Sequence, residues 1–244
     1  MSISLNKIFD IAYEIRSYYN GLMNDSFYKE VQKDKRESNG NYKEKEEFLL
    51  KEVGKDKVVL DIACNDGYFG SLLIERGNTV HGVDIASDNL KIAAKKGIKV
   101  KYVNVETEDL PYKDNTFDAV FLGDIIEHIF DTDRFLRECR RVLKKKGKLI
   151  ITTPNVASFG RRMMLLLGIS PFLETSTELP VNGLPSVGHV RYYTANTLRN
   201  QLRHNRFSSI YIRGNSLGLY YFTIPFFGPY IPSICTHLMC VAKK

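Results

Sequence analysis

KVVLDIACNDGYFG, at residues 57–70, joins a run of apolar, β-branched residues to a turn that begins with an acid and continues with small or turn-forming residues. The run predicts a buried strand at 57–63, and the spacing after the turn predicts a helix at 68–76 that ends at Gly77. A strand-to-helix turn with short side chains lets backbone N–H groups approach a ligand closely. The stretch therefore predicts a ligand-binding turn in an α/β protein.

Outward from this turn, the chain repeats the alternation of short apolar runs and segments with helical spacing. Such alternation is typical of a parallel sheet with crossover helices. We predict an α/β fold with a Rossmann-like, seven-stranded, mostly parallel sheet flanked by helices. Its strands are expected at 57–63, 79–84, 99–105, 117–124, 148–154, 208–214 and 237–244, its further helices at 88–96, 132–143 and 194–204, and a turn at KKKGK, 144–148.

Two parts of the chain lie outside this alternation. Residues 1–50, whose first segment spaces Leu5, Ile8 and Ile15 at helical intervals, are expected to form an N-terminal helical addition to a domain at 51–244. Residues 155–190 break the alternation with proline and glycine around the apolar run MMLLLGI. We expect this insert after the fifth strand to be a lid or pocket wall, with an ordinary packed helix as the alternative.

Composition narrows the class of protein. The 43% hydrophobic content of 244 residues suffices for a core, and the four cysteines show no metal-ligand spacing, which favours a reducing, cytoplasmic setting. The net charge is +7, but acids and bases alternate along 29–57, which indicates a solvated helix surface rather than nucleic-acid binding.

The uncharged stretch at 217–234 is the one segment that invites comparison with a membrane span. Its three prolines and two glycines would break any helix there, so we expect no transmembrane span. A hydrophobic pocket wall or lid is the preferred interpretation, and shallow peripheral contact with a membrane is the alternative.

Two acids follow the first two strands and define the chemistry of the ligand. The turn lacks the G-x-G-x-x-G fingerprint of nucleotide oxidoreductases, and Asp61 at its head would repel a pyrophosphate but would suit a cationic amine. Asp84 ends the second strand, where a carboxylate accepts hydrogen bonds from ribose hydroxyls. A helix cap or a solvated loop acid is the alternative for each. Together they predict a ligand with a ribose and an amine but no phosphate.

At this point the chain resembles a known family. DIACNDGYFG looks like the first motif, D-x-G-x-G-x-G, of class I S-adenosylmethionine-dependent methyltransferases. GVD, ETEDLPY, FDAVFLGDIIEH and LKKKGKLIITTPN resemble the later motifs of that family, in the right order. The resemblance covers residues 55–155 and implies that 51–244 is a methyltransferase domain with S-adenosyl-L-methionine as its cofactor.

The resemblance also implies roles for individual residues. Those implied to bind the cofactor are Asp61, Ala63, Asn65 and Gly67 at the methionine part, Asp84 and Ile85 at the ribose, Glu106 and Thr107 at the adenine, and Gly123 and Asp124 at the methionine end. Ala63 and Asn65 depart from the motif, which has glycine at both positions. Asparagine tolerates a left-handed backbone, whereas Ala63 is expected at a negative φ.

The acceptor is expected to be a small molecule, with O-methylation of a sugar, a lipid-linked compound or a quinone-like compound as the preferred reaction. An attacking hydroxyl needs a base, and Asp124, Glu127, His128 and His189 are the candidate catalytic residues, while His189, Arg191 and Tyr193 in GHVRYYT are the candidate substrate-binding residues. The Glu127–His128 pair could instead cap the next helix, and Arg191 could pair with a surface acid. DIIEH resembles only in part a magnesium-holding motif, so we assign no metal ligand.

Three other functions compete with this interpretation. A pI near 9.1 keeps an RNA methyltransferase open, although the fourth strand lacks the N/D-P-P-Y type of motif and no RNA-binding module is visible, so we expect no stable nucleic-acid partner. A non-catalytic regulatory protein that binds the same cofactor is the second, and a nucleotide oxidoreductase is the third. The sequence leaves the oligomeric state open.

Overall fold

The computed structural model describes residues 40–168, 170–172, 188–219, 222–224 and 230–244. The chain divides into two compact units, Met1–Lys43 and Glu44–Lys244. The first described element, helix α3 (Gly40–Val53), spans this division, and every strand belongs to the second unit. Residues 1–39 of the helical addition expected at 1–50, and residues 169 and 173–187 of the insert expected at 155–190, lie outside the described residues.

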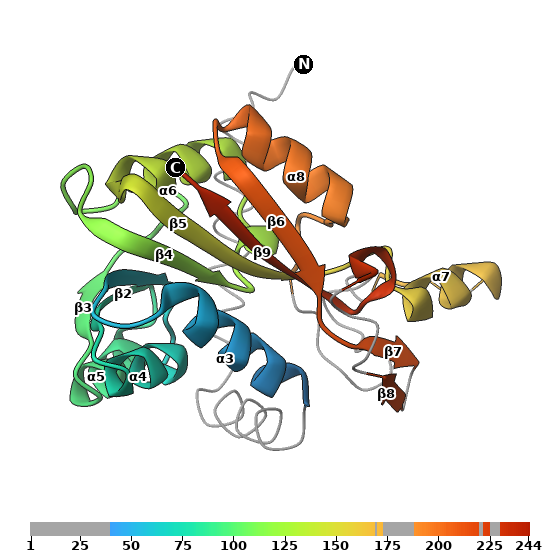
Figure 1. The fold of residues 1–244 in the computed structure, drawn as a ribbon, viewed down its shortest axis with the longest axis horizontal. Helices are drawn as coiled ribbons and strands as arrows, with labels where there is room; N and C mark the ends of the chain where they lie inside the picture. Colours follow the sequence, from blue (N-terminus) through green and yellow to red (C-terminus); the bar gives the residue numbers. More distant parts are fainter. Residues whose placement is uncertain (1–39, 169, 173–187, 220–221, 225–229) are drawn as a thin grey trace, which may run out of the picture. The chain divides into compact units, whose positions relative to one another are not determined.

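A seven-stranded sheet forms the centre of the second unit, with the strand order β3-β2-β1-β4-β5-β9-β6 (Figure 1). Strands β1 to β5 are parallel to one another, and β9 is antiparallel to both of its neighbours, β5 and β6. The strands are β1 (Val58–Ile62), β2 (Thr79–Asp84), β3 (Lys99–Tyr102), β4 (Phe117–Gly123), β5 (Leu143–Pro154), β6 (Ser208–Gly214) and β9 (His237–Lys243). The predicted fold class is confirmed.

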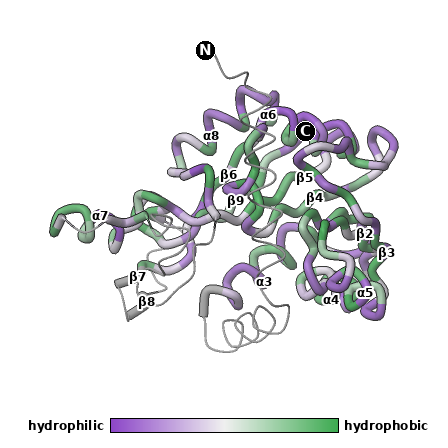
Figure 2. Tube along the Cα trace, turned by 180° about the vertical axis from the view of Figure 1, so that it is seen from behind, coloured by the Kyte–Doolittle hydropathy of each residue, from purple (hydrophilic) through white to green (hydrophobic). Residues whose placement is uncertain are grey.

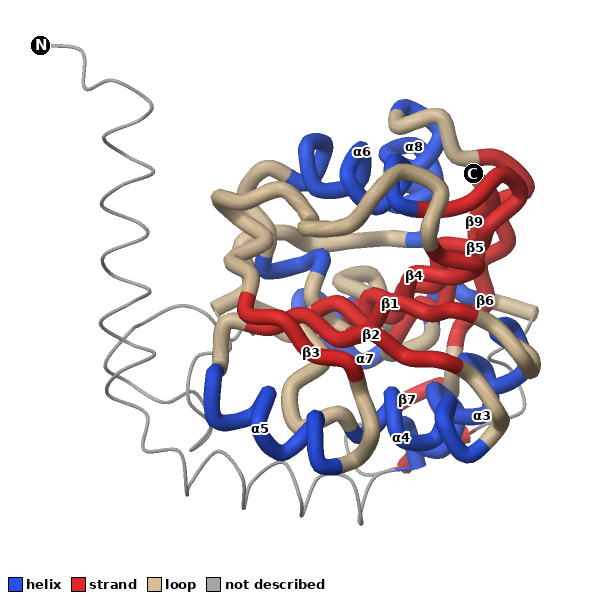
Figure 3. Tube along the Cα trace, turned by 90° about the vertical axis from the view of Figure 1, so that its left-hand side faces the viewer, coloured by secondary structure: helices blue, strands red, loops and turns tan. Residues whose placement is uncertain are grey.

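Helices cover both faces of this sheet (Figure 3). Helices α6 (Thr132–Val142) and α8 (Ala195–His204) lie on one face, and α3, α4 (Tyr68–Glu75) and α5 (Ser87–Lys95) lie on the other. Parallel strands need such crossover helices, and the helices bury both faces of the sheet. The predicted Thr194 cap of α8 is present, because its side chain accepts a hydrogen bond from the Thr197 backbone N–H.

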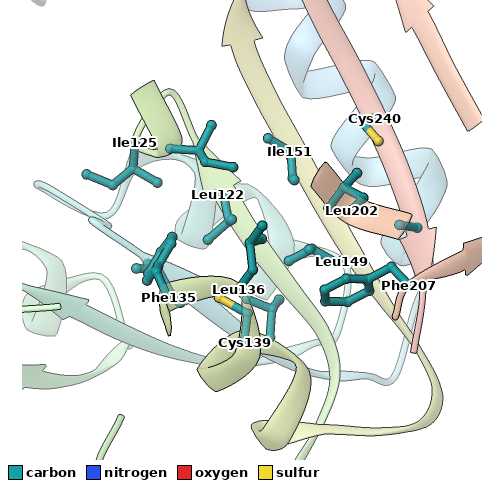
Figure 4. Close-up of a cluster of buried hydrophobic side chains, with 14 of the residues drawn as sticks. Leu122, Ile125, Phe135, Leu136, Cys139, Leu149, Ile151, Leu202, Phe207 and Cys240 are labelled. Atoms are coloured by element: carbon teal, nitrogen blue, oxygen red, sulfur yellow. The ribbon is translucent and has the colours of Figure 1, made fainter. Parts of the chain in front are cut away.

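Each face of the sheet has its own apolar core. Leu136 and Cys139 of α6 and Leu202 of α8 pack with Leu122, Leu149 and Ile151 of the central strands (Figure 4). On the opposite face, Phe48 and Leu49 of α3 and Leu73 of α4 pack against Phe121 and Ile150. All four cysteines are buried and free, as expected for scattered thiols. These two cores fix the ends of the strands, where the candidate site lies.

The strand order locates the place where a ligand would bind. β1 has β2 on one side and β4 on the other, so the chain reverses its direction of travel across the sheet at β1. In open α/β sheets, ligands bind at such a switch point, outside the carboxyl ends of the strands. The loops after β1, β2 and β4 therefore frame the candidate site.

One predicted turn is wrong. KKKGK, 144–148, lies within β5, which begins at Leu143 rather than at residue 148. Leu143 pairs with Phe117 and Lys148 pairs with Ala119, so the extra residues of β5 form an irregularity against β4. Residues 144–147 have no partner in β4, and Lys146 among them has φ 65°, so the backbone is irregular here although the segment lies within the bounds of β5.

The apolar segments predicted to be lids are described only in part. Helix α7 (Phe159–Leu166) has no buried residue, and Leu165 and Leu166 at its end are exposed on a largely hydrophobic helix (Figure 2). Within 217–234, β7 (Leu217–Leu219) pairs with β8 (Phe222–Ile224), and a short 3-10 helix, η3, covers Pro232–Ile234. No helix among the described residues has the length and apolar character to cross a membrane. A lid function of the insert stays a prediction.

Candidate functional site

In the loop between β1 and α4, every second residue from 63 to 67 has a left-handed backbone. Ala63 has φ 57°, Asn65 has φ 50° and Gly67 has φ 76°. The expected negative φ of Ala63 is therefore wrong, because the turn imposes the left-handed conformation at each position where the family motif has glycine. The Ala63 methyl group bears the steric cost of this conformation, about 1 kcal/mol.

Glycine is required at Gly67 for two independent reasons. Its backbone is left-handed, and a Cβ there would lie 2.4 Å from Cδ1 of Ile98 and 2.9 Å from Cβ of Ala93. The loop thus passes tightly over the N-terminus of α4 and the neighbouring α5–β3 connection. This close packing fixes the path of the turn.

Asp84, at the end of β2, ties the two loops together. One of its carboxylate oxygens accepts a hydrogen bond from the Asn65 backbone N–H at 2.8 Å, and the other accepts from the Ala86 N–H at 2.9 Å. Asp84 therefore caps the two loops, as in the alternative interpretation of this acid. Each oxygen keeps a second lone pair, so the same carboxylate can also accept hydrogen bonds from ribose hydroxyls.

Asp61 is a buried acid with an unusual environment. Asp61 is 3% exposed, and no residue that the structure describes donates a hydrogen bond to its carboxyl group. Burial, and then the nearby Asp84 and Asp66 carboxylates, raise the pKa of Asp61 to about 8. An acid held neutral by burial and like charge is ready to ionise beside a cation. This is the place where an ammonium or sulfonium group would fit.

The predicted adenine and ribose residues lie at the ends of β2 and β3. Ile85 follows Asp84 and is 39% exposed, so its side chain offers an apolar surface next to the ribose carboxylate. Glu106 accepts a hydrogen bond from the Phe130 backbone N–H at 2.8 Å, and the Thr107 N–H donates to the Asn104 carbonyl. Glu106 therefore joins the loop after β3 to the loop after β4, and its contact with adenine stays a prediction.

Gly123 ends β4, and Asp124 directly follows it. A Cβ at Gly123 would lie 2.9 Å from the Phe121 ring, so only glycine fits there. Asp124 has φ 53°, accepts a hydrogen bond from the Thr152 hydroxyl at 2.9 Å and forms an ion pair with Lys45 of α3. Burial raises the pKa of Asp124, but Lys45 and the other partners outweigh it and hold the pKa low. Asp124 is therefore a weak base.

Lys45 is the functional residue that sequence reasoning missed. Its side chain is 5% exposed, although it lies in the charged stretch at 29–57 that predicted a solvated surface. Periodicity could not have found it, because a buried lysine and a surface lysine look alike until the carboxylate that receives it is known. Lys45 pairs with Asp124 and Lys96 pairs with Asp66, so two acids of the candidate site have a lysine as partner.

Glu127 lies in the 3-10 helix η1 (Ile126–His128) after β4 and is 2% exposed. One carboxyl oxygen, Oε2, accepts a hydrogen bond from the Thr153 hydroxyl at 2.9 Å, and Oε1 is buried without a hydrogen-bond partner. Burial, and then the Asp124 carboxylate, raise the pKa of Glu127. The predicted alternative, a helix cap, does not apply, because Asp131 caps α6.

His128 and His189 meet beside Glu127, although 60 residues separate them in sequence. The backbone N–H groups of Val190 and Arg191 both donate to the Glu127 carbonyl, at 2.9 and 3.0 Å. These bonds bring His189 Nε2 to 4.0 Å from Glu127 Oε1 and place the two imidazole rings 4.9 Å apart, centre to centre. The three predicted catalytic groups thus form one cluster next to Asp124.

The two remaining substrate-binding candidates point elsewhere. The Arg191 guanidinium donates to the Phe130 carbonyl, and the Tyr193 hydroxyl donates to Gln201 at 2.9 Å. Tyr193 is 5% exposed and packs in the core under α8. Both line a cavity of about 410 Å³ between α8 and the start of α6. Contact of these residues with an acceptor stays a prediction, and the packing of Tyr193 does not favour it.

The geometry suits a ligand that carries positive charge, a ribose and an apolar ring. Asp61 would meet the cation, Asp84 the ribose hydroxyls and Ile85 one face of the ring. The cluster of Glu127, His128 and His189 follows at the end of β4, so an acceptor there would lie beside the cationic end of the ligand. The carboxyl edge of the sheet thus offers adjoining sites for a nucleoside and for a reacting partner.

Comparison with known proteins agrees with this geometry. Residues 60–151 match the family of methyltransferase domains. A demethylmenaquinone methyltransferase of Thermotoga maritima is 36% identical over 116 residues, which are 46% of this chain and 50% of that protein. A ubiquinone biosynthesis O-methyltransferase of Bartonella bacilliformis is 32% identical over 101 residues, which are 40% of this chain and 41% of that protein. The chain spans about half the length of the curated relatives it matches.

Solved structures share the fold. A methyltransferase from Archaeoglobus fulgidus has a TM-score of 0.61 at 19% identity, with coverage of 88% of this chain and 99% of that one. A protein of Thermotoga maritima named as a possible histamine N-methyltransferase has a TM-score of 0.60 at 21% identity, with coverage of 82% and 87%. At these identities the likeness concerns the fold alone.

Proposed function

Over residues 60–151 this chain carries a methyltransferase domain of the class I S-adenosylmethionine-dependent family, and from this premise we propose that the protein transfers a methyl group to a small-molecule acceptor. S-adenosyl-L-methionine is the cofactor of that family. When bound, it supplies an activated methyl group on a sulfonium, so no covalent intermediate on the protein is required. The protein's task is to align the acceptor with the methyl group and to manage the acceptor proton.

The observation that carries this proposal is the charge pattern at the ends of β1 and β2. Asp61 is buried without a donor among the described residues, and Asp84 and Asp66 lie close enough to raise its pKa. Concentrated negative charge of this kind is costly unless a cation neutralises it. The amine and sulfonium of the cofactor would do so, whereas the phosphates of a dinucleotide would add to the repulsion.

We assign the base to His189 and a positioning role to Glu127. The side chain of His189 is 12% exposed, and its Nε2 atom lies 4.0 Å from Oε1 of Glu127, whose side chain is 3% exposed. The histidine can therefore reach an acceptor, while the acid behind it orients the ring and stabilises the imidazolium that forms. Asp124 is held by Lys45 and Thr152, so we now expect it to support the site rather than to take the proton.

The acceptor class is the finer part of the proposal. A histidine base serves a hydroxyl acceptor, which must lose its proton as the new bond forms. Two relatives named above act, by name, in quinone biosynthesis, and this supports a quinone-like or otherwise hydroxylated small molecule, such as a sugar or a lipid-linked compound. The cytoplasmic setting and the absence of a stable nucleic-acid partner remain predictions.

Methyl transfer from labelled cofactor to panels of catechols, hydroxyquinones and sugars tests the proposal. We expect transfer to one class, with kcat reduced about 100-fold or more in His189→Ala and the affinity for S-adenosylhomocysteine unchanged. Lys91→Ala, at a solvent-exposed ion pair of α5, is the matched control and should keep full activity. Cofactor binding without transfer to any acceptor would favour the regulatory alternative, and no cofactor binding at all would refute the proposal.

A further inference from the structure

A second cavity, of about 590 Å³, lies at the amino ends of the parallel strands, opposite the candidate site at their carboxyl ends. It is lined mainly by cations. Its charged lining comprises Arg137, Arg140, Arg141, Arg206, Lys244 and one acid, Asp114. Asp114 precedes β4, Arg140 and Arg141 precede β5, Arg206 precedes β6, and Lys244 follows the antiparallel β9 (Figure 1). These positions are at the amino ends of the parallel strands. The seven residues of β4 place its amino end roughly 20 Å from its carboxyl end, where the candidate site lies.

Most of this positive charge is not neutralised by acids. Arg141 pairs with Glu138 at 2.8 Å and with Asp114 at 2.9 Å. Among the described residues, no carboxylate forms an ion pair with the other four cations, Arg137, Arg140, Arg206 and Lys244. The C-terminal ends of α6 and α8 point into this region and together contribute about one unit of negative charge. With the five cations, the two acids and the helix ends all counted, about two positive charges remain in a space the size of a small-molecule site.

The polar contacts of Lys244 and Arg140 keep their charges in place without cancelling them. The Lys244 ammonium donates to the Leu143 carbonyl at 2.6 Å and to the Arg141 carbonyl at 3.2 Å, and Arg140 Nε donates to the Arg206 carbonyl at 3.2 Å. Burial, and then Arg140, lower the pKa of Lys244. A bound anion would relieve this crowding of like charges.

Arg206 adds an observation that the turn itself does not explain. It follows the C-cap Asn205 of α8 with φ 63°, and the Phe207 N–H donates to the Leu202 carbonyl at 3.0 Å. This is the position after a helix where glycine is normally found, because other side chains are strained there. A chain that keeps an arginine at this position gives up about 1 kcal/mol of backbone stability. Glycine can therefore replace Arg206 without strain, so the role of the guanidinium can be tested apart from that of the turn.

We propose that this basic cavity binds a small, multiply charged phosphate compound, at a site separate from the methyltransferase site. Four cations around one space suit an anion with two or more phosphate groups, since each phosphate accepts several charge-assisted hydrogen bonds. A cavity of about 590 Å³ favours a small molecule over the extended backbone of a nucleic acid. The proposal does not depend on the reaction that the carboxyl edge of the sheet performs.

Titration calorimetry with inorganic tripolyphosphate tests the site. We expect binding that weakens with salt, a dissociation constant raised about tenfold or more in both Arg206→Gly and Arg137→Gln, and no change in Lys91→Ala. Arg206→Gly is the decisive variant, because glycine suits the positive φ and its unfolding temperature should be unchanged or higher. Weaker binding in a protein that is at least as stable cannot come from misfolding.

Two further measurements distinguish the site from its alternatives. Saturation with S-adenosylhomocysteine should leave the tripolyphosphate affinity unchanged, because the two edges of the sheet are separate. The proposal is wrong if tripolyphosphate does not bind at millimolar concentration, if Arg206→Gly binds it as the parent does, or if S-adenosylhomocysteine displaces it. It is also wrong if a 20-base-pair RNA duplex binds more tightly than tripolyphosphate and loses more affinity in Arg206→Gly, since the occupant would then be nucleic acid.

Discussion

Lys45 of α3 forms an ion pair with Asp124 at the carboxyl end of β4, and the Lys45 side chain is 5% exposed whereas the Asp124 side chain is 36% exposed. The pair joins a helix that precedes the first strand to the loop where an acceptor would bind. Burial raises the pKa of Glu127, and the ionised Asp124 carboxylate raises it further, whereas the Lys45 ammonium lowers it. The helix before β1 thereby influences the protonation of the candidate site.

Removal of the lysine should destabilise the protein. Lys45→Met leaves the Asp124 carboxylate without its cation, and we expect the free energy of unfolding at pH 7 to fall by about 1 to 3 kcal/mol, measured by urea denaturation. Adding Asp124→Asn should restore part of the loss. If the two changes are additive instead, the pair is not coupled. In the parent the pKa of Asp124 is lowered, so the stability from this pair should be lost as pH falls from about 4 towards 2.

Cofactor binding should release protons at neutral pH. The pKa of Asp61 is raised to about 8, so this acid is mostly protonated at pH 7 in the free protein. A cation bound beside it favours the ionised form. Calorimetry of S-adenosylmethionine binding in buffers of different ionisation enthalpy should report release of roughly one proton. Asp61→Asn should abolish that release, and an equal proton count in variant and parent would remove Asp61 from the cofactor site.

The two raised carboxyl groups also predict how stability depends on pH. A group whose pKa is higher in the folded state stabilises the protein below its unfolded pKa and loses this contribution as pH rises through the folded value. Burial raises the pKa of Asp61 to about 8 and also raises that of Glu127. The cofactor-free protein should therefore lose stability as the pH rises from about 4 towards 8. Asp61→Asn should flatten this slope, and an unchanged slope would contradict the assignment.

Asp84 should contribute to cofactor affinity through charged hydrogen bonds. Asp84→Ala removes the acceptor of the ribose hydroxyls and also of the Asn65 and Ala86 backbone N–H groups. We expect the affinity for S-adenosylhomocysteine to weaken by about 1 to 3 kcal/mol. Asp84→Asn keeps one carbonyl acceptor and should lose less. A dissociation constant that does not change in Asp84→Ala would contradict the ribose assignment.

The left-handed residues after β1 provide a matched pair of variants. Ala63→Gly removes a methyl group from a residue with φ 57° and should stabilise the protein by up to about 1 kcal/mol. Gly67→Ala places a Cβ 2.4 Å from Ile98 and should destabilise it by about 2 to 4 kcal/mol. Thermal unfolding of both variants checks the difference in sign. Equal effects would mean that the turn relaxes in solution.

The sequence determined the elements of this protein, because local patterns carry that information. The alternation of apolar runs and helical spacing predicted all seven strands of the sheet, and the acids at positions 61 and 84 predicted a ligand site at the carboxyl ends of two of them. The KKKGK error shows the limit of local composition, because β5 includes this segment although residues 144–147 have no partner in β4.

Only the tertiary structure decided which distant side chains share a site. Lys45 reaches Asp124 across 79 positions, His189 reaches Glu127 through backbone hydrogen bonds across 62 positions, and Arg206 joins Lys244 at the far edge of the sheet. Such contacts depend on how the helices pack on the sheet, and one sequence pattern is compatible with many packings. Burial then changes the meaning of each charge: the same lysine or acid that would be solvated on a surface sets the protonation of its neighbours once it is withdrawn from water.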